Sequence, residues 1–133
     1  MPEYFEILVV DESAMLRNFI ATTLRRQLRV DAVHMAATVD EAIGLLNRHP
    51  SICMVFTEIE VGGKSGLDLI KILRQSERDD VPLLVVTDRT DKAAFQQAIE
   101  AGVTDYIVKP FSEAVLARKA ILWSGGKALA ASA

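Results

Sequence analysis

Residues 52–57 are Ile52-Cys53-Met54-Val55-Phe56-Thr57, and they are followed by Glu58 and a loop that contains Gly62 and Gly63. Continuous hydrophobicity over six residues predicts a strand that is covered on both faces, as in a parallel sheet. Similar short runs, rich in Val, Ile, Leu or Phe, occupy residues 5–10, 31–36, 82–87 and 104–108. The sequence therefore predicts five buried strands.

Segments with helical spacing separate these runs. Apolar residues at i, i+3 and i+4 positions form stripes in each segment, for example at Leu16, Phe19, Ile20, Leu24 and Leu28. Helix starts are indicated by Ser13, Thr38, Thr90 and Ser112. Strict alternation of strands and helices predicts a doubly wound α/β fold of the flavodoxin type, with five parallel strands in the order 2-1-3-4-5.

Polar side chains follow four of the predicted strands at the point where each strand ends. In the predicted strand order these ends meet at one edge of the sheet, around the point where the strand order reverses. The residues concerned are Asp11, Glu12, Glu58, Thr87 and Lys109. Clustered carboxylates beside a hydroxyl and an ammonium group suit the handling of a phosphoryl group and a divalent cation.

Length and composition restrict the class of protein. A chain of 133 residues with a net charge of −3 predicts one domain, over 1–123, and a short tail or linker remnant over 124–133. The acidic balance argues against direct binding to nucleic acid. No apolar run approaches the roughly 18 residues that span a bilayer, and no signal peptide is evident, so we expect a cytoplasmic protein without membrane contact.

Four motifs resemble the response-regulator receiver domain of two-component signalling, over residues 5–122. They are Val9-Val10-Asp11-Glu12-Ser13-Ala14-Met15, Gly66-Leu67-Asp68-Leu69, Val86-Thr87, and the run from Ala101 to Phe111 that contains Tyr106-Ile107-Val108-Lys109-Pro110. Each motif alone is weak. Together, in this order and at this spacing, they are specific.

The resemblance implies roles for several residues. The phosphoacceptor aspartate of the family stands eight residues before the glycine that opens the third helix, and counting back from Gly66 gives Glu58. Mg²⁺ would be bound by Asp11, Glu12 and Glu58, and the residues leave open whether it binds here. Lys109 would contact the phosphoryl oxygens, and we expect it to contact Glu58 directly. The Lys109-Pro110 bond is expected to be cis, and Thr87 and Tyr106 are expected to form the switch pair.

Departures from the family pattern favour a receiver that is not phosphorylated. Glu58 is one methylene longer than aspartate, and misplacement by an ångström can cost a hundredfold in rate. Glu12 is longer than the usual metal ligand, Asp88 adds a carboxylate, and Val61-Gly62 predicts a more flexible loop. The alternative is a conventional receiver in which Glu58 mimics the phosphorylated aspartate.

The resemblance further implies a signalling module rather than an enzyme. Its partners would be a histidine kinase, a phosphotransfer protein or an output protein, and a homodimer is also compatible with it. The expected surface is the face of the fourth helix, fifth strand and fifth helix, including Lys92, Gln96, Tyr106 and Arg118.

Other classes fit the residues poorly. A Mg²⁺-dependent phosphate-ester hydrolase of the haloacid-dehalogenase type would have a second aspartate two residues after Asp11, where this chain has Ser13. A flavin carrier would need a phosphate-binding loop after the first strand. His34 and His49 have no companion ligands at metal-binding spacing in the sequence, so both are interpreted as structural or solvated.

Overall fold

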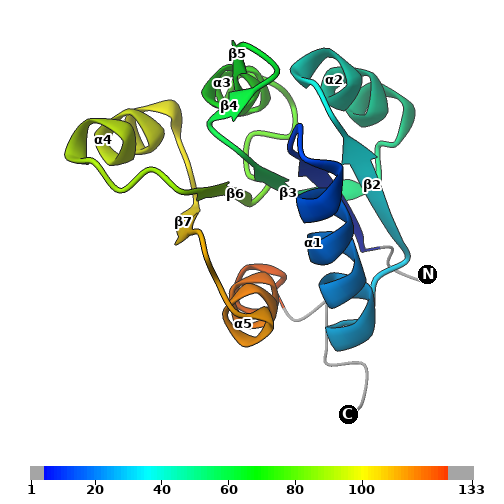
Figure 1. Cartoon of the computed structure of the whole chain (residues 1–133). Coiled ribbons are helices and arrows are strands. Elements are labelled where there is room, and N and C mark those ends of the chain that lie inside the picture. The colour runs from blue at the N-terminus through cyan, green and yellow to red at the C-terminus, as the bar shows by residue number, and fades with distance from the viewer. Residues whose placement is uncertain (1–4, 126–133) are drawn as a thin grey trace.

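The computed structural model describes residues 5–125, and the fold is an open α/β sheet covered on both faces (Figure 1). The strands are β1 (Glu6–Val10), β2 (Ala32–Ala36), β3 (Ile52–Thr57), β6 (Leu83–Thr87) and β7 (Asp105–Val108), all parallel, in the order β2-β1-β3-β6-β7. The helices are α1 (Ala14–Gln27), α2 (Val39–Arg48), α3 (Gly66–Arg74), α4 (Lys92–Ala101) and α5 (Glu113–Trp123). The predicted fold and strand order are confirmed, with β6 and β7 as the fourth and fifth strands of the sheet.

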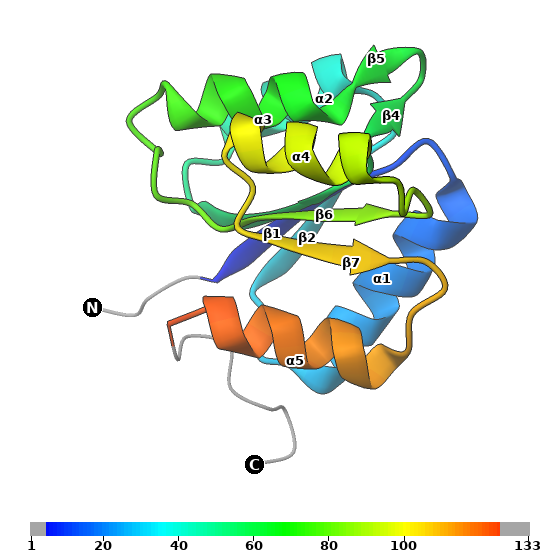
Figure 2. The same ribbon diagram turned by 90° about the vertical axis from the view of Figure 1, so that its left-hand side faces the viewer.

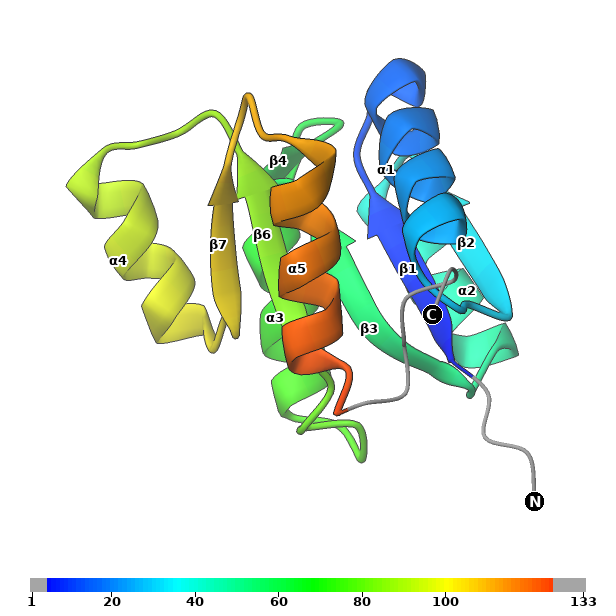
Figure 3. The same ribbon diagram turned by 90° about the horizontal axis from the view of Figure 1, so that it is seen from below.

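Two helical layers enclose the sheet. Figure 2 shows α2, α3 and α4 on one face, with α1 and α5 on the other, and Figure 3 shows α1 and α5 in front of the strands. Alternate residues of β1 point to opposite faces, so Leu8 packs in the α2 and α3 layer while Ile7 packs in the α1 and α5 layer. Because both faces are buried, the strands read as continuous apolar runs rather than as alternating ones.

Helix starts follow the predicted side chains with one exception. The hydroxyls of Ser13, Thr38 and Ser112 each accept a hydrogen bond from the backbone N–H three residues ahead. The prediction of Thr90 as the cap of α4 was wrong. Asp91 caps this helix instead, because its carboxylate accepts from the backbone N–H of Ala94, and aspartate caps at least as well as threonine.

A short antiparallel hairpin was not predicted. It consists of β4 (Glu60–Val61) and β5 (Lys64–Ser65), and it connects β3 to α3. Its two turn residues are Gly62 and Gly63, whose φ angles of 58° and 83° lie in the region that glycine adopts without steric cost. The glycines therefore form a defined hairpin turn, where the sequence suggested a more flexible loop.

Residues 126–133 of the expected tail lie outside the described residues. Within residues 5–125 no helix combines the length and apolar character needed to cross a membrane.

Asp105 joins β7 to α5. Its Oδ1 accepts from Lys119 Nζ at 3.0 Å and from the backbone N–H of Tyr106 at 2.8 Å. Its Oδ2 accepts from Trp123 Nε1 at 2.8 Å. Burial alone would raise the pKa of this carboxyl, but the donors outweigh burial and hold the pKa below its ordinary value. The ionised form of Asp105 thus stabilises the packing of α5.

Replacing Asp105 by Asn is predicted to lower the free energy of unfolding at neutral pH by about 1–3 kcal/mol, through loss of charge-assisted hydrogen bonds. Because the folded pKa is below the unfolded one, this stabilisation is complete above about pH 4 and is lost as the pH falls through the folded pKa. Urea unfolding followed by Trp123 fluorescence should show the difference from wild type shrinking as the pH falls below about 4.

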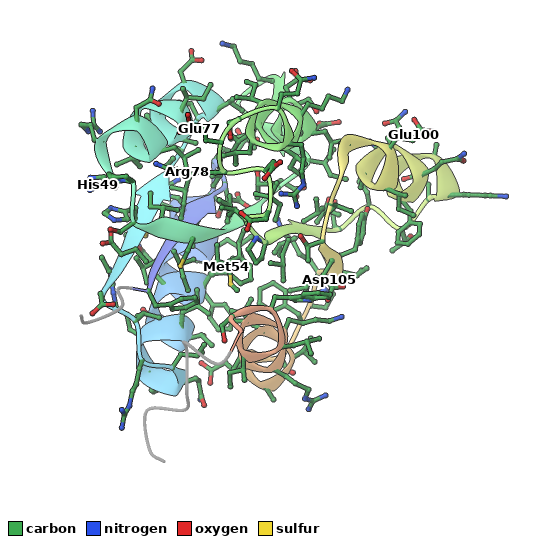
Figure 4. All side chains as sticks on the ribbon, turned by 180° about the vertical axis from the view of Figure 1, so that it is seen from behind. His49, Met54, Glu77, Arg78, Glu100 and Asp105 are labelled. Atoms are coloured by element: carbon green, nitrogen blue, oxygen red, sulfur yellow. The ribbon has the colours of Figure 1, made fainter. Side chains whose placement is uncertain are left out.

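Glu100 provides the control for this prediction. It lies on the outer side of α4, whereas Asp105 lies between β7 and α5 (Figure 4), so Glu100→Gln should be close to neutral at every pH. A constant difference between wild type and Asp105→Asn across the pH range would refute the role assigned to the carboxylate.

Candidate functional site

The polar residues predicted at the strand ends do gather at one edge of the sheet. The carboxyl ends of β1, β3 and β6 and the segment after β7 surround a cavity of about 220 Å³. It is lined by Asp11, Glu12, Glu58, Ile59, Glu60, Thr87, Asp88, Arg89 and Lys109. We call this cavity the acidic pocket, because five of its nine lining residues are aspartate or glutamate.

Asp11 is fixed in the floor of the acidic pocket. It directly follows β1, and its backbone N–H donates to the carbonyl of Ala36 in the neighbouring strand at 3.1 Å. Its side chain is almost fully buried. Oδ1 accepts from the backbone N–H of Ser13 at 2.8 Å, and Oδ2 accepts from Lys109 Nζ at 3.1 Å. Both oxygens of this carboxylate therefore have donors within the protein.

Glu58 reaches the same ammonium group from β3. Its backbone N–H continues the sheet by donating to the carbonyl of Val10 at 3.0 Å. Oε1 accepts from Lys109 Nζ at 3.0 Å, which confirms the predicted direct contact, and Oε2 accepts from the backbone N–H of Ile59. Glu58 is thus held inside the acidic pocket at both of its oxygens.

Lys109 supplies the positive charge between the two carboxylates. It follows β7 and precedes Pro110, and the bond between them is cis, as predicted. Burial lowers the pKa of its ammonium, but hydrogen bonds to Glu58 and Asp11, together with their charges, outweigh burial and leave the pKa above its ordinary value. Lys109 is therefore a permanent cation at neutral pH.

The predicted set of Mg²⁺ ligands has suitable chemistry but is not assembled as a metal site in this arrangement. Carboxylate oxygens are the ligands that Mg²⁺ prefers, and the resemblance to receiver domains implies a Mg²⁺ site at this place. However, Lys109 lies within hydrogen-bonding distance of both Asp11 and Glu58, and Glu12 is exposed to solvent. Within residues 5–125, these three acids do not form a group whose ligand atoms lie within 4.8 Å of one another.

Thr87 and Tyr106 are linked through the backbone of Arg89. Thr87 is fully buried, and its Oγ1 accepts from the backbone N–H of Arg89 at 3.3 Å. The hydroxyl of Tyr106 donates to the carbonyl of Arg89 at 2.8 Å, and its ring meets the ring of Phe95 edge-on at 5.3 Å. The two residues of the expected switch pair are thus hydrogen-bonded to one intervening residue.

Arg89 was not singled out from the sequence. Its guanidinium pairs with Asp91 at 2.9 Å and lies 3.9 Å from Glu60, on the hairpin that the sequence did not predict. The signal that could have identified it is its position two residues beyond Thr87, at the same strand end as the other site residues. It gives the acidic pocket a second cation beside Lys109.

Gly66 determines how closely α3 approaches Glu58. Its backbone N–H donates to the carbonyl of Ile59 at 2.6 Å. A Cβ atom at this position would lie 1.9 Å from the carbonyl oxygen of Glu58 and 2.7 Å from Oγ1 of Thr57. Only glycine fits without moving the backbone that carries Glu58.

Comparison with known proteins gives a consistent result. Residues 7–121 match the response regulator receiver domain. The chain is 37% identical over 115 residues to a chemotaxis protein CheY homolog of Campylobacter jejuni, covering 86% of this chain and 88% of the relative. It is 35% identical to chemotaxis protein CheY1 of Helicobacter pylori, covering 86% and 92%.

Solved structures share the fold. The chemotaxis response regulator CheY4 of Vibrio cholerae superposes with a TM-score of 0.81 at 22% identity, covering 90% of this chain and 98% of that one. A response regulator from Chloroflexus aurantiacus also gives a TM-score of 0.81, at 24% identity, covering 90% and 97%.

The close approach at Gly66 generates a prediction. Gly66→Ala should lower the free energy of unfolding by about 1–3 kcal/mol, because the added methyl group must displace the backbone of Glu58. Gly44→Ala is the matched control, since the nearest atom to its Cβ would be an arginine nitrogen at 3.8 Å and alanine favours the interior of α2. Chemical denaturation of both variants tests this; equal stability of Gly66→Ala and wild type would show that α3 tolerates the shift.

Proposed function

The chain belongs to the response regulator receiver domain family, and on this premise we propose that it is a signalling receiver that binds protein partners without being phosphorylated. In this proposal the protein is an interaction module and not an enzyme. The observation that carries the proposal is the position of Glu58, whose carboxylate lies in the acidic pocket with both oxygens engaged.

The first argument concerns the geometry of phosphoryl transfer. We assign Glu58 to the phosphoacceptor position of the family, eight residues before Gly66. Attack on a phosphoryl donor requires a free carboxylate oxygen held in line with the leaving group. The side chain of Glu58 is one methylene longer than that of aspartate, and its oxygens accept from Lys109 and the Ile59 backbone. This arrangement favours a fixed counter-ion over a nucleophile.

The second argument concerns charge. The acidic pocket has five carboxylates and two cations, Arg89 and Lys109. Arg89 is paired with Asp91, and Lys109 is shared by two acids, while Asp88 is exposed at the rim. A phosphoryl donor carries negative charge, so like-charge repulsion opposes its entry. The same balance leaves Lys109 to neutralise the carboxylates without a metal ion.

A second candidate function is that of a conventional receiver in which glutamate replaces the acceptor aspartate at position 58. In this alternative Glu58 mimics the phosphorylated aspartate and holds the receiver in an active-like state. The contact of 3.0 Å between Glu58 Oε1 and Lys109 Nζ favours it, because the resemblance assigns Lys109 to the phosphoryl oxygens. One carboxylate nevertheless supplies less charge and one oxygen fewer than a phosphoryl group.

Receiver domains interact with histidine kinases and output proteins. We propose that this chain does so through the surface of α4, β7 and α5. Lys92, Gln96 and Arg118 are exposed there, and Tyr106 is half-buried beside Phe95. Phe95 and Ile99 on α4 are 48% and 55% exposed, which adds apolar contact area of the kind that interface centres use. Self-association is a competing use of this surface, and nucleic acid is not an expected partner.

Treatment with acetyl phosphate and Mg²⁺, followed by intact mass measurement, tests the proposal. We expect no stoichiometric phosphoryl adduct on the wild-type chain, and an adduct on Glu58→Asp, because shortening the side chain restores the family's nucleophile. A Mg²⁺-dependent adduct at Glu58 of the wild type would overturn the proposal. If neither the wild type nor Glu58→Asp reacts, the barrier to phosphorylation would be assigned to the carboxylates at the rim of the acidic pocket. Asp88→Asn removes one of these carboxylates and tests that assignment.

Lys109→Met tests the role of the ammonium group. Asp11 and Glu58 are 6% and 13% exposed and would lose their shared counter-charge, so we expect a loss of roughly 2–4 kcal/mol in the free energy of unfolding. Mg²⁺ should restore part of this loss in the variant and stabilise the wild type less, as read from thermal unfolding with and without the ion.

The control for Lys109→Met is Lys92→Met, which removes an exposed lysine on α4 and should leave both stability and the Mg²⁺ response unchanged. An equal Mg²⁺ response in wild type and Lys109→Met would contradict the view that Lys109 takes the charge-balancing role of the metal.

A further inference from the structure

A second cluster of polar side chains lies at the end of the sheet opposite the acidic pocket. Glu6 begins β1, His34 lies in the middle of β2, and His49 directly follows α2 as its C-cap. The register of the two strands pairs Leu8 with His34. Glu6 lies two residues before Leu8 and therefore points to the same face of the sheet as His34, toward α2.

The three side chains converge closely. Glu6 Oε1 lies 2.7 Å from His34 Nε2, and the rings of His34 and His49 stack with centroids 4.1 Å apart and planes inclined at 28°. Each residue offers one ligand atom such that all three atoms lie within 4.8 Å of one another, and all three residues are half-buried. The spacing of the histidines in the sequence did not indicate this cluster, because the strand register and the end of α2 bring together residues that are distant in sequence.

We propose that Glu6, His34 and His49 form a binding site for a first-row transition metal ion of the Zn²⁺ type, with solvent completing the coordination. Two imidazole nitrogens and one carboxylate oxygen are ligands that Zn²⁺ prefers, whereas Mg²⁺ prefers oxygen alone. Zn²⁺ ligands at 2.0–2.1 Å in a tetrahedron are about 3.4 Å apart, so side-chain rotations of modest size would complete the site. The ion would take the place of the hydrogen between Glu6 Oε1 and His34 Nε2, and the neutral imidazole of His34 would then carry its hydrogen on Nδ1.

The backbone around His49 is held firmly enough to present a ligand. His49 donates its N–H to the carbonyl of Leu45 at 2.8 Å, and its own carbonyl accepts from Ile52 at 3.1 Å. Arg78, from the segment after α3, donates from Nη2 to the carbonyl of Leu46 at 2.6 Å (Figure 4 labels His49 and Arg78). Two of the three ligand residues lie in strands of the sheet, and the third follows a helix whose end is fixed by these bonds.

The simpler explanation is that Glu6 and His34 form an ordinary hydrogen bond and that the ring of His49 stacks on the ring of His34. The two explanations differ in the role of His49. A hydrogen-bonded pair needs only Glu6 and His34, whereas a metal ion joins all three residues and fastens the end of α2 to β1 and β2. A bound ion would therefore raise the stability of the folded state in proportion to the logarithm of its concentration.

Titration of the untagged chain with ZnCl₂ tests the site. Calorimetry is expected to give one equivalent bound per chain, and thermal unfolding to shift upward with zinc. Glu6→Gln, His34→Gln and His49→Gln should each weaken binding at least tenfold. Glu100→Gln, an exposed carboxylate on α4, is the matched control and should leave binding unchanged, and MgCl₂ in place of ZnCl₂ should give no effect that depends on the histidines.

A direct spectroscopic signal complements the variants, since His34 and His49 are the only two histidines of the chain. Zinc should shift the imidazole nitrogen resonances of both residues in NMR spectra of the wild type. This measurement does not depend on whether the variants fold. Zinc binding that leaves both imidazoles unshifted, or that survives in His49→Gln, overturns the proposal. Neither result bears on phosphorylation at Glu58.

Discussion

The candidate site depends on the ion pairs that the ammonium group of Lys109 makes with Asp11 and Glu58. A doubly wound sheet brings the carboxyl ends of its central strands to one edge, and here that edge carries Asp11 and Glu58 in a largely buried setting. Two such carboxylates repel each other unless a cation lies between them. Lys109 meets this requirement from the end of β7, which is separated from β3 by β6, at 3.1 and 3.0 Å. The positions of Glu58, of the hairpin that follows it and of α3 are all consistent with that pairing.

Much of the fold was predictable because it depends on local pattern. Five short apolar runs, separated by segments of helical period, are sufficient to indicate strands buried on both faces and the crossover helices between them. The convergence of Asp11, Glu58, Thr87 and Lys109 followed from the same reasoning, since Thr87 ends a strand and the other three each stand directly after one. The contact between Glu58 and Lys109 was also expected, because the extra methylene extends the carboxylate toward the ammonium group.

The features that were missed depend on tertiary placement. The β4–β5 hairpin consists of two-residue strands, too short to show a period, and Arg89 acquires its role only through the neighbouring Tyr106 and Glu60. The cluster of Glu6, His34 and His49 arises from strand register, which the sequence does not specify residue by residue. The cap of α4 was misplaced by one residue because Thr90 and Asp91 are both good capping residues and adjacent.

The length of β7 bears on how the molecule behaves at high concentration. Edge strands expose unpaired backbone groups that can recruit another chain, and proteins limit this hazard with short strands and with charged side chains that point inward. β7 has four residues, and it begins with Asp105, whose carboxylate is directed at Lys119 and Trp123. An intruding strand would find few free backbone groups and a charged residue at the start of the ladder. The short, charged edge strand therefore disfavours edge-to-edge pairing with a strand of another chain.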